Sequence, residues 1–260
     1  MPHMTFAIRM RFPATDVSLF RAIVLSAMVV GFVTGAAITL VQFFTTVPLI
    51  LSAEVYEHDD SEAAAKAGPA AHEHAAHEHA AHEQAEHEHG SAAWEPKEGL
   101  QRNSFTAAAN ILTAIGFALL LAGIYALRGH PVAWHEGLLW GLAGFAVFTV
   151  APGLGLPPEL PGVPAAPLEA RQVWWIATAA ATASGLGLLV LRRAVWAAAL
   201  GVGLIILPHV IGAPQLAEIH TDVPAALSQQ FVVAVTLTSL LFWLLLGSLT
   251  SIAYRRFAAS

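Results

Sequence analysis

Residues 22–53 read AIVLSAMVVGFVTGAAITLVQFFTTVPLILSA, a run of 32 residues without a charged side chain. A helix needs about 20 predominantly apolar residues to cross the hydrocarbon core of a bilayer. A cleavable signal peptide has an apolar core of only about 7–15 residues. This run is too long for such a peptide, so we expect residues 22–53 to form a first transmembrane segment that stays in the protein, after a polar lead of residues 1–21.

Five further uncharged runs fill most of the remaining chain. Charged residues bound them at 103–127, 137–158, 172–191, 194–217 and 223–254. Each is long enough to span a membrane, so the sequence predicts an all-α polytopic membrane protein with six transmembrane helices, five of them within residues 103–256, and a cytoplasmic tail of residues 257–260. The alternative is five helices, because Pro208, Gly212 and Pro214 interrupt one run, which would then be re-entrant.

The overall composition agrees with a membrane protein. Only 12% of the residues are charged, whereas an average soluble domain is about 25% charged. The chain has no cysteine, which excludes disulfides and thiolate metal sites. Nucleic acid is not expected as a partner, because it needs a basic face and this chain has a net charge of −6 with its acids gathered in one loop. The sequence contains no phosphate-binding GxxxxGK[ST] pattern and no convergent set of catalytic acid and base residues, so we do not expect an enzyme.

The distribution of basic residues predicts the orientation of the segments. If the segments alternate in direction, eight of the twelve lysines and arginines lie on the side of the N-terminus: Arg9, Arg11, Arg21, Arg128, Arg192, Arg193, Arg255 and Arg256. Cytoplasmic loops are enriched in basic residues. We therefore expect both termini in the cytoplasm, and residues 54–102 as a long external loop without regular structure.

This loop contains four near-repeats, AAHEH, AAHEH, AAHEQ and AEHEH, over residues 70–89, which we call the histidine tract. It holds seven of the thirteen histidines: His72, His74, His77, His79, His82, His87 and His89. Neutral imidazole binds zinc, copper, nickel and cobalt, and an unperturbed pKa of about 6.5 leaves most histidines neutral at pH 7. The interleaved glutamates attract divalent cations. We expect several weak, exchanging metal sites here; the alternative is a low-complexity spacer.

Three residues outside the tract complete the candidate metal ligands. Glu54 and His58 follow the first apolar run, on the side of the external loop. With Glu159, His220 and Asp222 they would form an acidic entrance for a cation. His209 lies inside an apolar run, where ionisable groups are rare and often functional. His209 could equally bond to carbonyl groups freed by the neighbouring proline. Four polar residues in the apolar runs have two possible roles: they could supply oxygen ligands along an ion path, or they could form hydrogen bonds between helices. They are Gln42, Asn110, Gln229 and Gln230.

Several stretches carry a family resemblance: FR at residues 20–21, PLILSAEVY at 48–56, GLLWGLAGF at 137–145, APGLGLPPELPG at 151–162, ARQVWW at 170–175 and LPHVIGAP at 207–214. Together they resemble the CbtA family of cobalt transporter subunits, from Leu19 onward. The resemblance implies about five spans, import of Co²⁺ across the bacterial inner (cell) membrane, a link with cobalamin metabolism, and a small histidine-bearing membrane partner resembling CbtB.

The sequence therefore predicts a membrane protein that takes up a divalent transition metal, without a prosthetic group. Cobalt is implied by the resemblance, and nickel and zinc are the alternatives. The histidine tract would capture the ion on the periplasmic or extracellular side. The outer carboxylates and His209 would pass it to a path between helices. The rival hypotheses are an accessory or sensor subunit that binds metal without conducting it, and a membrane-embedded metalloenzyme.

Overall fold

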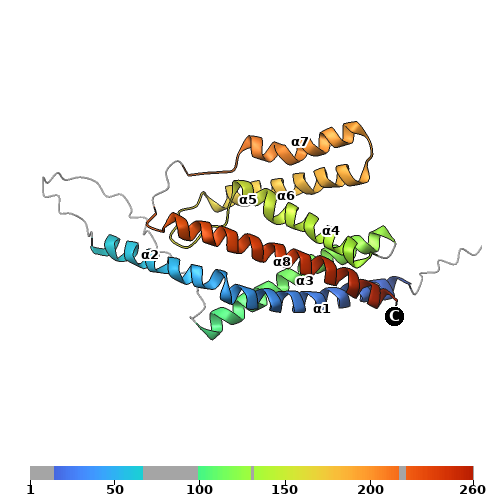
Figure 1. The fold of residues 1–260 in the computed structure, drawn as a ribbon, viewed down its shortest axis with the longest axis horizontal. Helices are drawn as coiled ribbons and strands as arrows, with labels where there is room; N and C mark the ends of the chain where they lie inside the picture. Colours follow the sequence, from blue (N-terminus) through green and yellow to red (C-terminus); the bar gives the residue numbers. More distant parts are fainter. Residues whose placement is uncertain (1–14, 67–98, 130–131, 217–220, 260) are drawn as a thin grey trace, which may run out of the picture.

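The computed structural model describes residues 15–66, 99–129, 132–216 and 221–259. Every regular element in these ranges is a helix (Figure 1), which confirms the predicted all-α class. In chain order the elements are α1 (Thr15–Phe44), α2 (Thr46–Lys66), α3 (Leu100–Arg128), α4 (Trp134–Phe145), the π-helix η1 (Ala146–Val150), α5 (Ala151–Gly155), α6 (Leu168–Leu191), α7 (Val195–Ile211) and α8 (Ala225–Ala258).

Five helical segments of the described chain are long and apolar enough to cross a membrane: Ser18–Phe44, Leu100–Arg128, Trp134–Gly155, Leu168–Leu191 and Ala225–Ala258. The run expected as a further span, residues 194–217, forms only α7, which has 17 residues. At 1.5 Å per residue α7 is about 26 Å long, compared with a hydrocarbon core of about 30 Å. The prediction of six spans is therefore not confirmed, and the alternative of five agrees with the structure. α7 ends because Gly212 takes a positive φ of 88°.

The uncharged run of residues 22–53 forms two helices rather than one. α1 ends at Phe44 and α2 begins at Thr46. Pro48 has no N–H to donate to the carbonyl four residues earlier, and its ring clashes with that carbonyl, so a continuous helix is broken one turn before the proline. α2 then continues beyond the apolar run, so residues 54–66, expected to begin the unstructured loop, are helical.

Small residues bring α1 and α3 into close contact. The four-residue spacing of Gly31 and Gly35 favours tight helix packing. In the structure, a Cβ added to Gly35 would lie 2.5 Å from the Cα of Ile111, and one added to Gly31 would lie 2.6 Å from the Cα of Ile115. Both distances are too short for any side chain, so the two glycines determine how closely α1 and α3 approach.

α4 and α8 approach in the same way, through the second pair of spaced glycines. A Cβ on Gly137 would lie 2.5 Å from the carbonyl oxygen of Gly247, and Gly141 lies against the backbone of Trp243. α8 also packs on α1 and α3. The helices α1, α3, α4 and α8 therefore form one bundle, whose buried core contains Tyr125, Trp243 and Leu246.

α6 and α7 form a hairpin beside this bundle (Figure 1). The hairpin is joined to the rest mainly through η1 and α5, which contact α6. η1 precedes Pro152, which lies in α5 and cannot complete the normal helical hydrogen bond to Phe148. One turn of wider π-helix accommodates this missing bond, as the N–H of Ala151 donates to the carbonyl of Ala146.

The bundle has two distinct ends. α1 begins and α8 finishes at one of them, which we call the terminal end; α2 finishes and α3 begins at the other, the loop end (Figure 1). At the loop end, residues of α2, α8 and the segments before α6 and α8 form a second buried cluster: Ala53, Leu160, Val223 and Phe231. The histidine tract lies outside the described residues; in the sequence it follows α2 and precedes α3.

Candidate functional site

The seven histidines of the tract, His72, His74, His77, His79, His82, His87 and His89, lie outside the described residues, as does His220. His58 lies in α2, one helical turn beyond Glu54. The structure does describe the two helices between which the tract is inserted, α2 before it and α3 after it. The geometry of these helices is therefore the first part of the candidate site.

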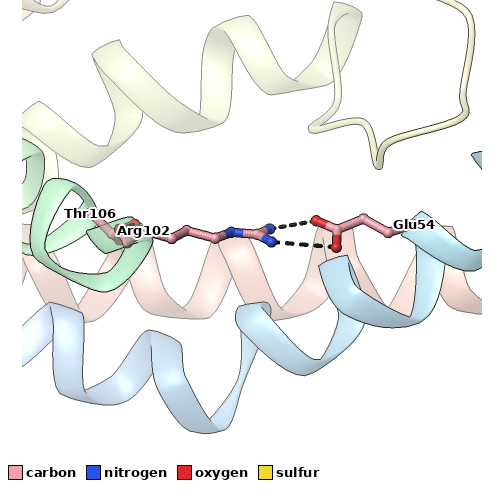
Figure 2. Close-up of polar contacts among 3 residues, drawn as sticks. All are labelled: Glu54, Arg102 and Thr106. Atoms are coloured by element: carbon pink, nitrogen blue, oxygen red, sulfur yellow. Dashed lines mark hydrogen bonds and ion pairs between the residues drawn. The ribbon is translucent and has the colours of Figure 1, made fainter. Parts of the chain in front are cut away.

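An ion pair joins α2 to α3 at the loop end (Figure 2). Nη2 of Arg102 donates to Oε1 of Glu54 at 2.5 Å, and Nη1 donates to Oε2 at 3.3 Å. The side chains are 32% and 23% exposed, so the pair is partly shielded from water and the two-bond geometry makes it stronger than an ordinary surface pair. A metal ion at Glu54 would have to compete with Arg102 for the same two oxygens.

A second polar contact joins α1 to α3 two turns further into the bundle. The amide nitrogen of Asn110 donates to the hydroxyl of Thr39 at 2.9 Å and to the side-chain oxygen of Gln42 at 2.6 Å. Of the two roles left open for Gln42 and Asn110, the structure displays the hydrogen bond between helices. Gln229 and Gln230 are exposed near the start of α8.

The proline-rich segment between α5 and α6 is fixed to its surroundings by polar contacts. Arg171 forms an ion pair with Glu159 at 2.8 Å. The hydroxyl of Thr221 donates to the carbonyl of Gly162 at 2.8 Å, and the side-chain amide of Gln215 donates to Gly155 at 3.0 Å. These bonds hold the segments that precede α6 and α8 together at the loop end.

His209 lies in the last turn of α7, half-buried against Trp174 of α6. The two ring centroids are 6.0 Å apart in an edge-to-face arrangement. Nε1 of Trp174 donates to the carbonyl of Pro208 at 3.3 Å, and Gly155 leaves room for the Trp174 ring, since any Cβ there would collide with it. The indole therefore contacts both α5, which begins at the π-helical turn next to Pro152, and the end of α7, where it lies beside His209.

Two threonines continue the same face of α6 toward the middle of the membrane segment. Trp174, Thr178, Thr182 and Gly185 are spaced four, four and three residues apart, which places them on one side of a helix. Trp174 and Gly185 contact α7 on that side. Thr178 and Thr182 are 0% and 3% exposed, and their hydroxyl oxygens have no hydrogen-bond partner among the described residues.

The sequence interpretation did not single out these two threonines. The only available signal was their four-residue spacing in an apolar run. A helical threonine usually bonds to the carbonyl four residues earlier, as Thr106 does to Arg102, so the spacing alone does not indicate a free hydroxyl. Buried hydroxyls without a partner are uncommon and need an explanation.

The candidate ligands are not gathered into one site within the described parts of the chain. No group of three His, Asp or Glu residues lies close enough there to hold a metal ion. Glu54 and Glu159 are each paired with an arginine, and His209 lies in a separate group with Trp174. Among the described residues, the candidates form separate polar groups: the two carboxylate–arginine pairs, His209 with Trp174, and the two buried hydroxyls of α6.

Comparison with known protein families gives a match over most of the chain. A family model described as "Probable cobalt transporter subunit (CbtA)" matches residues 20–255 of the 260-residue chain. No curated protein and no solved structure matches it. The matched range includes every candidate residue described above.

Proposed function

Because the chain belongs to the CbtA family of probable cobalt transporter subunits, we propose that it takes up Co²⁺ across the bacterial inner membrane. The family match over residues 20–255 is the observation that carries the proposal. The five apolar helices supply a setting in which an ion can be moved through a bilayer. In this proposal cobalt is the transported ion and no prosthetic group takes part.

In this proposal the histidine tract captures the ion outside the cell. Its neutral imidazoles are suitable ligands for Co²⁺ and its glutamates add attraction for a divalent cation. The Glu54–Arg102 pair supports this role, because it holds together the two helices from which the tract extends. The proposal has the ion enter at this end of the bundle, where α2 and α3 are joined.

The path into the membrane begins in the α6–α7 hairpin. His209 supplies an imidazole at the point where two proline-interrupted helices meet. Transporters commonly bind ions at such interrupted helices, where backbone groups are released from the helical pattern. The hydroxyl groups of Thr178 and Thr182 lie deeper on the same face and supply oxygen atoms that no protein group uses in the described chain.

The membrane potential is sufficient to drive this uptake. A potential of 100 mV contributes about 2.3 kcal/mol per elementary charge. For a divalent cation moving inward that is about 4.6 kcal/mol, which corresponds to accumulation on the order of a thousand-fold. The proposal requires the loop end to face outward and both chain ends to lie in the cytoplasm, as the eight-to-four distribution of basic residues predicts.

Uptake of labelled cobalt into cells or vesicles tests the capture role. Deleting residues 70–90 should lower uptake chiefly when the metal is scarce, because capture matters least at saturating concentration. A matched control keeps the length and the glutamates of the tract and replaces only its seven histidines by asparagine. This variant should lower uptake at scarce metal as much as the deletion does. Unchanged uptake at every concentration in both variants would refute a capture role for the tract.

The role of His209 is tested by the same assay at plentiful metal. His209→Ala should lower uptake at every concentration, because it removes a ligand on the path rather than at the point of capture. His135→Ala is the matched control, because His135 is an exposed histidine at the other end of the bundle. Equal uptake by the two variants would remove His209 from the path.

The family description favours a second candidate function, since it names a subunit. The chain would then bind metal or sense it while a partner conducts, and a small histidine-bearing membrane protein resembling CbtB is the partner we would test first. Liposomes that contain only this chain separate the two functions, because a conducting protein admits Co²⁺ alone. Parallel measurements with Ni²⁺ and Zn²⁺ identify the preferred ion.

A further inference from the structure

A large open groove lies at the terminal end of the bundle, remote from every residue of the proposed path. Its volume is about 1260 Å³. Three arginines line it, Arg21 at the start of α1 and Arg255 with Arg256 at the end of α8. These helix ends lie side by side (Figure 1), so two distant parts of the sequence contribute positive charge to one place.

The rest of the groove is largely apolar. Leu25 and Ile252 line it one turn further into the bundle than Arg21 and Arg256 respectively, and both are exposed, at 37% and 51%. Trp134, which is 56% exposed, lies at the start of α4 and also lines it. Tryptophan is enriched where a membrane meets water. The groove therefore passes from a basic rim to an apolar floor in the direction of the bilayer.

The three arginines have no protein counter-ion among the described side chains, because the ion pairs there involve Arg102 and Arg171. All three are exposed. In contrast, Arg128 at the same end lies over the ring of Trp140, 5.7 Å from its centroid. Among the described side chains, no carboxylate therefore neutralises the charge that lines the groove.

We propose that this groove binds the headgroup of an anionic phospholipid, with its phosphate on Arg21, Arg255 and Arg256 and its upper acyl chains on Leu25 and Ile252. Guanidinium groups bind phosphate through paired hydrogen bonds, and basic pockets between membrane helices are known to bind anionic headgroups. The groove exceeds the volume of about 300–1000 Å³ usual for small-molecule sites, and it opens where a lipid of the surrounding bilayer can enter sideways. The site does not depend on cobalt transport.

Lipid retention measured by native mass spectrometry tests the proposal. The protein is reconstituted in nanodiscs of phosphatidylglycerol and phosphatidylcholine, released into detergent, and scored for bound phosphatidylglycerol. Each arginine near an anionic surface strengthens attraction about five-fold, so R256Q should weaken retention about five-fold, and the triple variant R21Q/R255Q/R256Q more strongly. Leu25→Gln should also weaken it, because that variant keeps every charge but makes the apolar floor polar.

The matched control is R192Q/R193Q. These arginines lie between α6 and α7, are exposed, and are not part of the groove. They should leave retention unchanged. Equal losses in the control and the groove variants would indicate a general attraction of basic residues and overturn the site. Displacement of the lipid by an equal concentration of glycerol phosphate would also overturn it, because a headgroup without acyl chains should compete poorly.

Discussion

The close contact between α6 and α7 gives a quantitative prediction about the hairpin that holds His209. A Cβ added to Gly185 would lie 2.5 Å from the carbonyl oxygen of Gly201, and one added to Gly201 would lie 2.8 Å from that of Gly185. The shortest ordinary carbon–oxygen contacts between helices are about 3.3 Å. Gly185→Ala therefore requires the two backbones to separate by about 0.8 Å.

The same helix contains the control that isolates this effect. Gly187 has nothing within 4 Å of an added Cβ, so Gly187→Ala changes helix propensity without changing packing. Both substitutions gain the roughly 1 kcal/mol by which alanine exceeds glycine in a helix. Only Gly185→Ala incurs the overpacking cost of about 1–3 kcal/mol. The difference between the two variants should thus be about 1–3 kcal/mol in the free energy of unfolding.

Thermal unfolding in detergent, followed by tryptophan fluorescence, measures this difference. At about 2–4 °C per kcal/mol for a chain of this size, Gly185→Ala should unfold roughly 2–12 °C below Gly187→Ala. On α7, Gly203 has the same open surroundings as Gly187, and Gly201→Ala against Gly203→Ala repeats the comparison. Equal midpoints within both pairs would mean that α6 and α7 do not meet through Gly185 and Gly201, and the position assigned to His209 would lose its support.

Three further predictions concern the polar contacts and the tract. Glu54→Gln should lower stability by about 0.5–1 kcal/mol, because the partly exposed pair with Arg102 loses its charge, and the thermal midpoint of Arg102→Gln should not fall further when Glu54→Gln is added. Trp174→Phe keeps an aromatic ring but removes the N–H that bonds to Pro208 and part of the buried indole, so it should cost at least the roughly 0.5–1.5 kcal/mol of one hydrogen bond; an unchanged midpoint would contradict that bond. Lowering the pH from 7.5 to 5.5 should release Co²⁺ from the histidine tract, since imidazole binds metal only in its neutral form and an unperturbed histidine is protonated below about 6.5; equilibrium dialysis measures the release, and pH-independent binding would indicate that the glutamates hold the ion.

Helix class and most span positions followed from the sequence because both depend on the length of apolar runs. The run 194–217 was expected as a span on the same rule, yet α7 stops at Ile211. The length of an uncharged run indicates which residues could lie in lipid. It does not indicate where the backbone leaves the helical conformation. Gly212 and Pro214 carried that second signal, which is why five spans was the alternative. Pro48 carries the same signal inside the first run, and the expectation of a single segment over residues 22–53, which rests on its apolar length, did not use it.

The contacts of the candidate site were less predictable, because they join residues far apart in the chain. Glu54 and Arg102 are 48 residues apart, and Asn110 and Gln42 are 68 apart. The sequence places Glu54 and Arg102 at the two ends of the expected loop, and it assigns no partner to any of the four residues. Gln42 and Asn110 could therefore be read as path-lining groups or as hydrogen bonds between helices. Only the antiparallel packing of α1 on α3 decides that they bond to each other.

The interruptions of the two helices near Trp174 belong to a single feature of the fold. Pro152 produces the π-helical turn in the segment before α6, and Pro208 interrupts the last turn of α7. In sequence these prolines are 56 residues apart and each could be explained as a local irregularity. In space the indole of Trp174 occupies the room left by Gly155 and donates to the carbonyl of Pro208. The carbonyl of Pro208 also accepts the N–H of Gly212 at 3.0 Å, so the indole adds a second hydrogen bond at the end of α7. Because α5 and the end of α7 both contact this ring, with His209 beside it and Thr178 and Thr182 further along the same face of α6, we propose this junction as the place where the ion enters its path through the membrane.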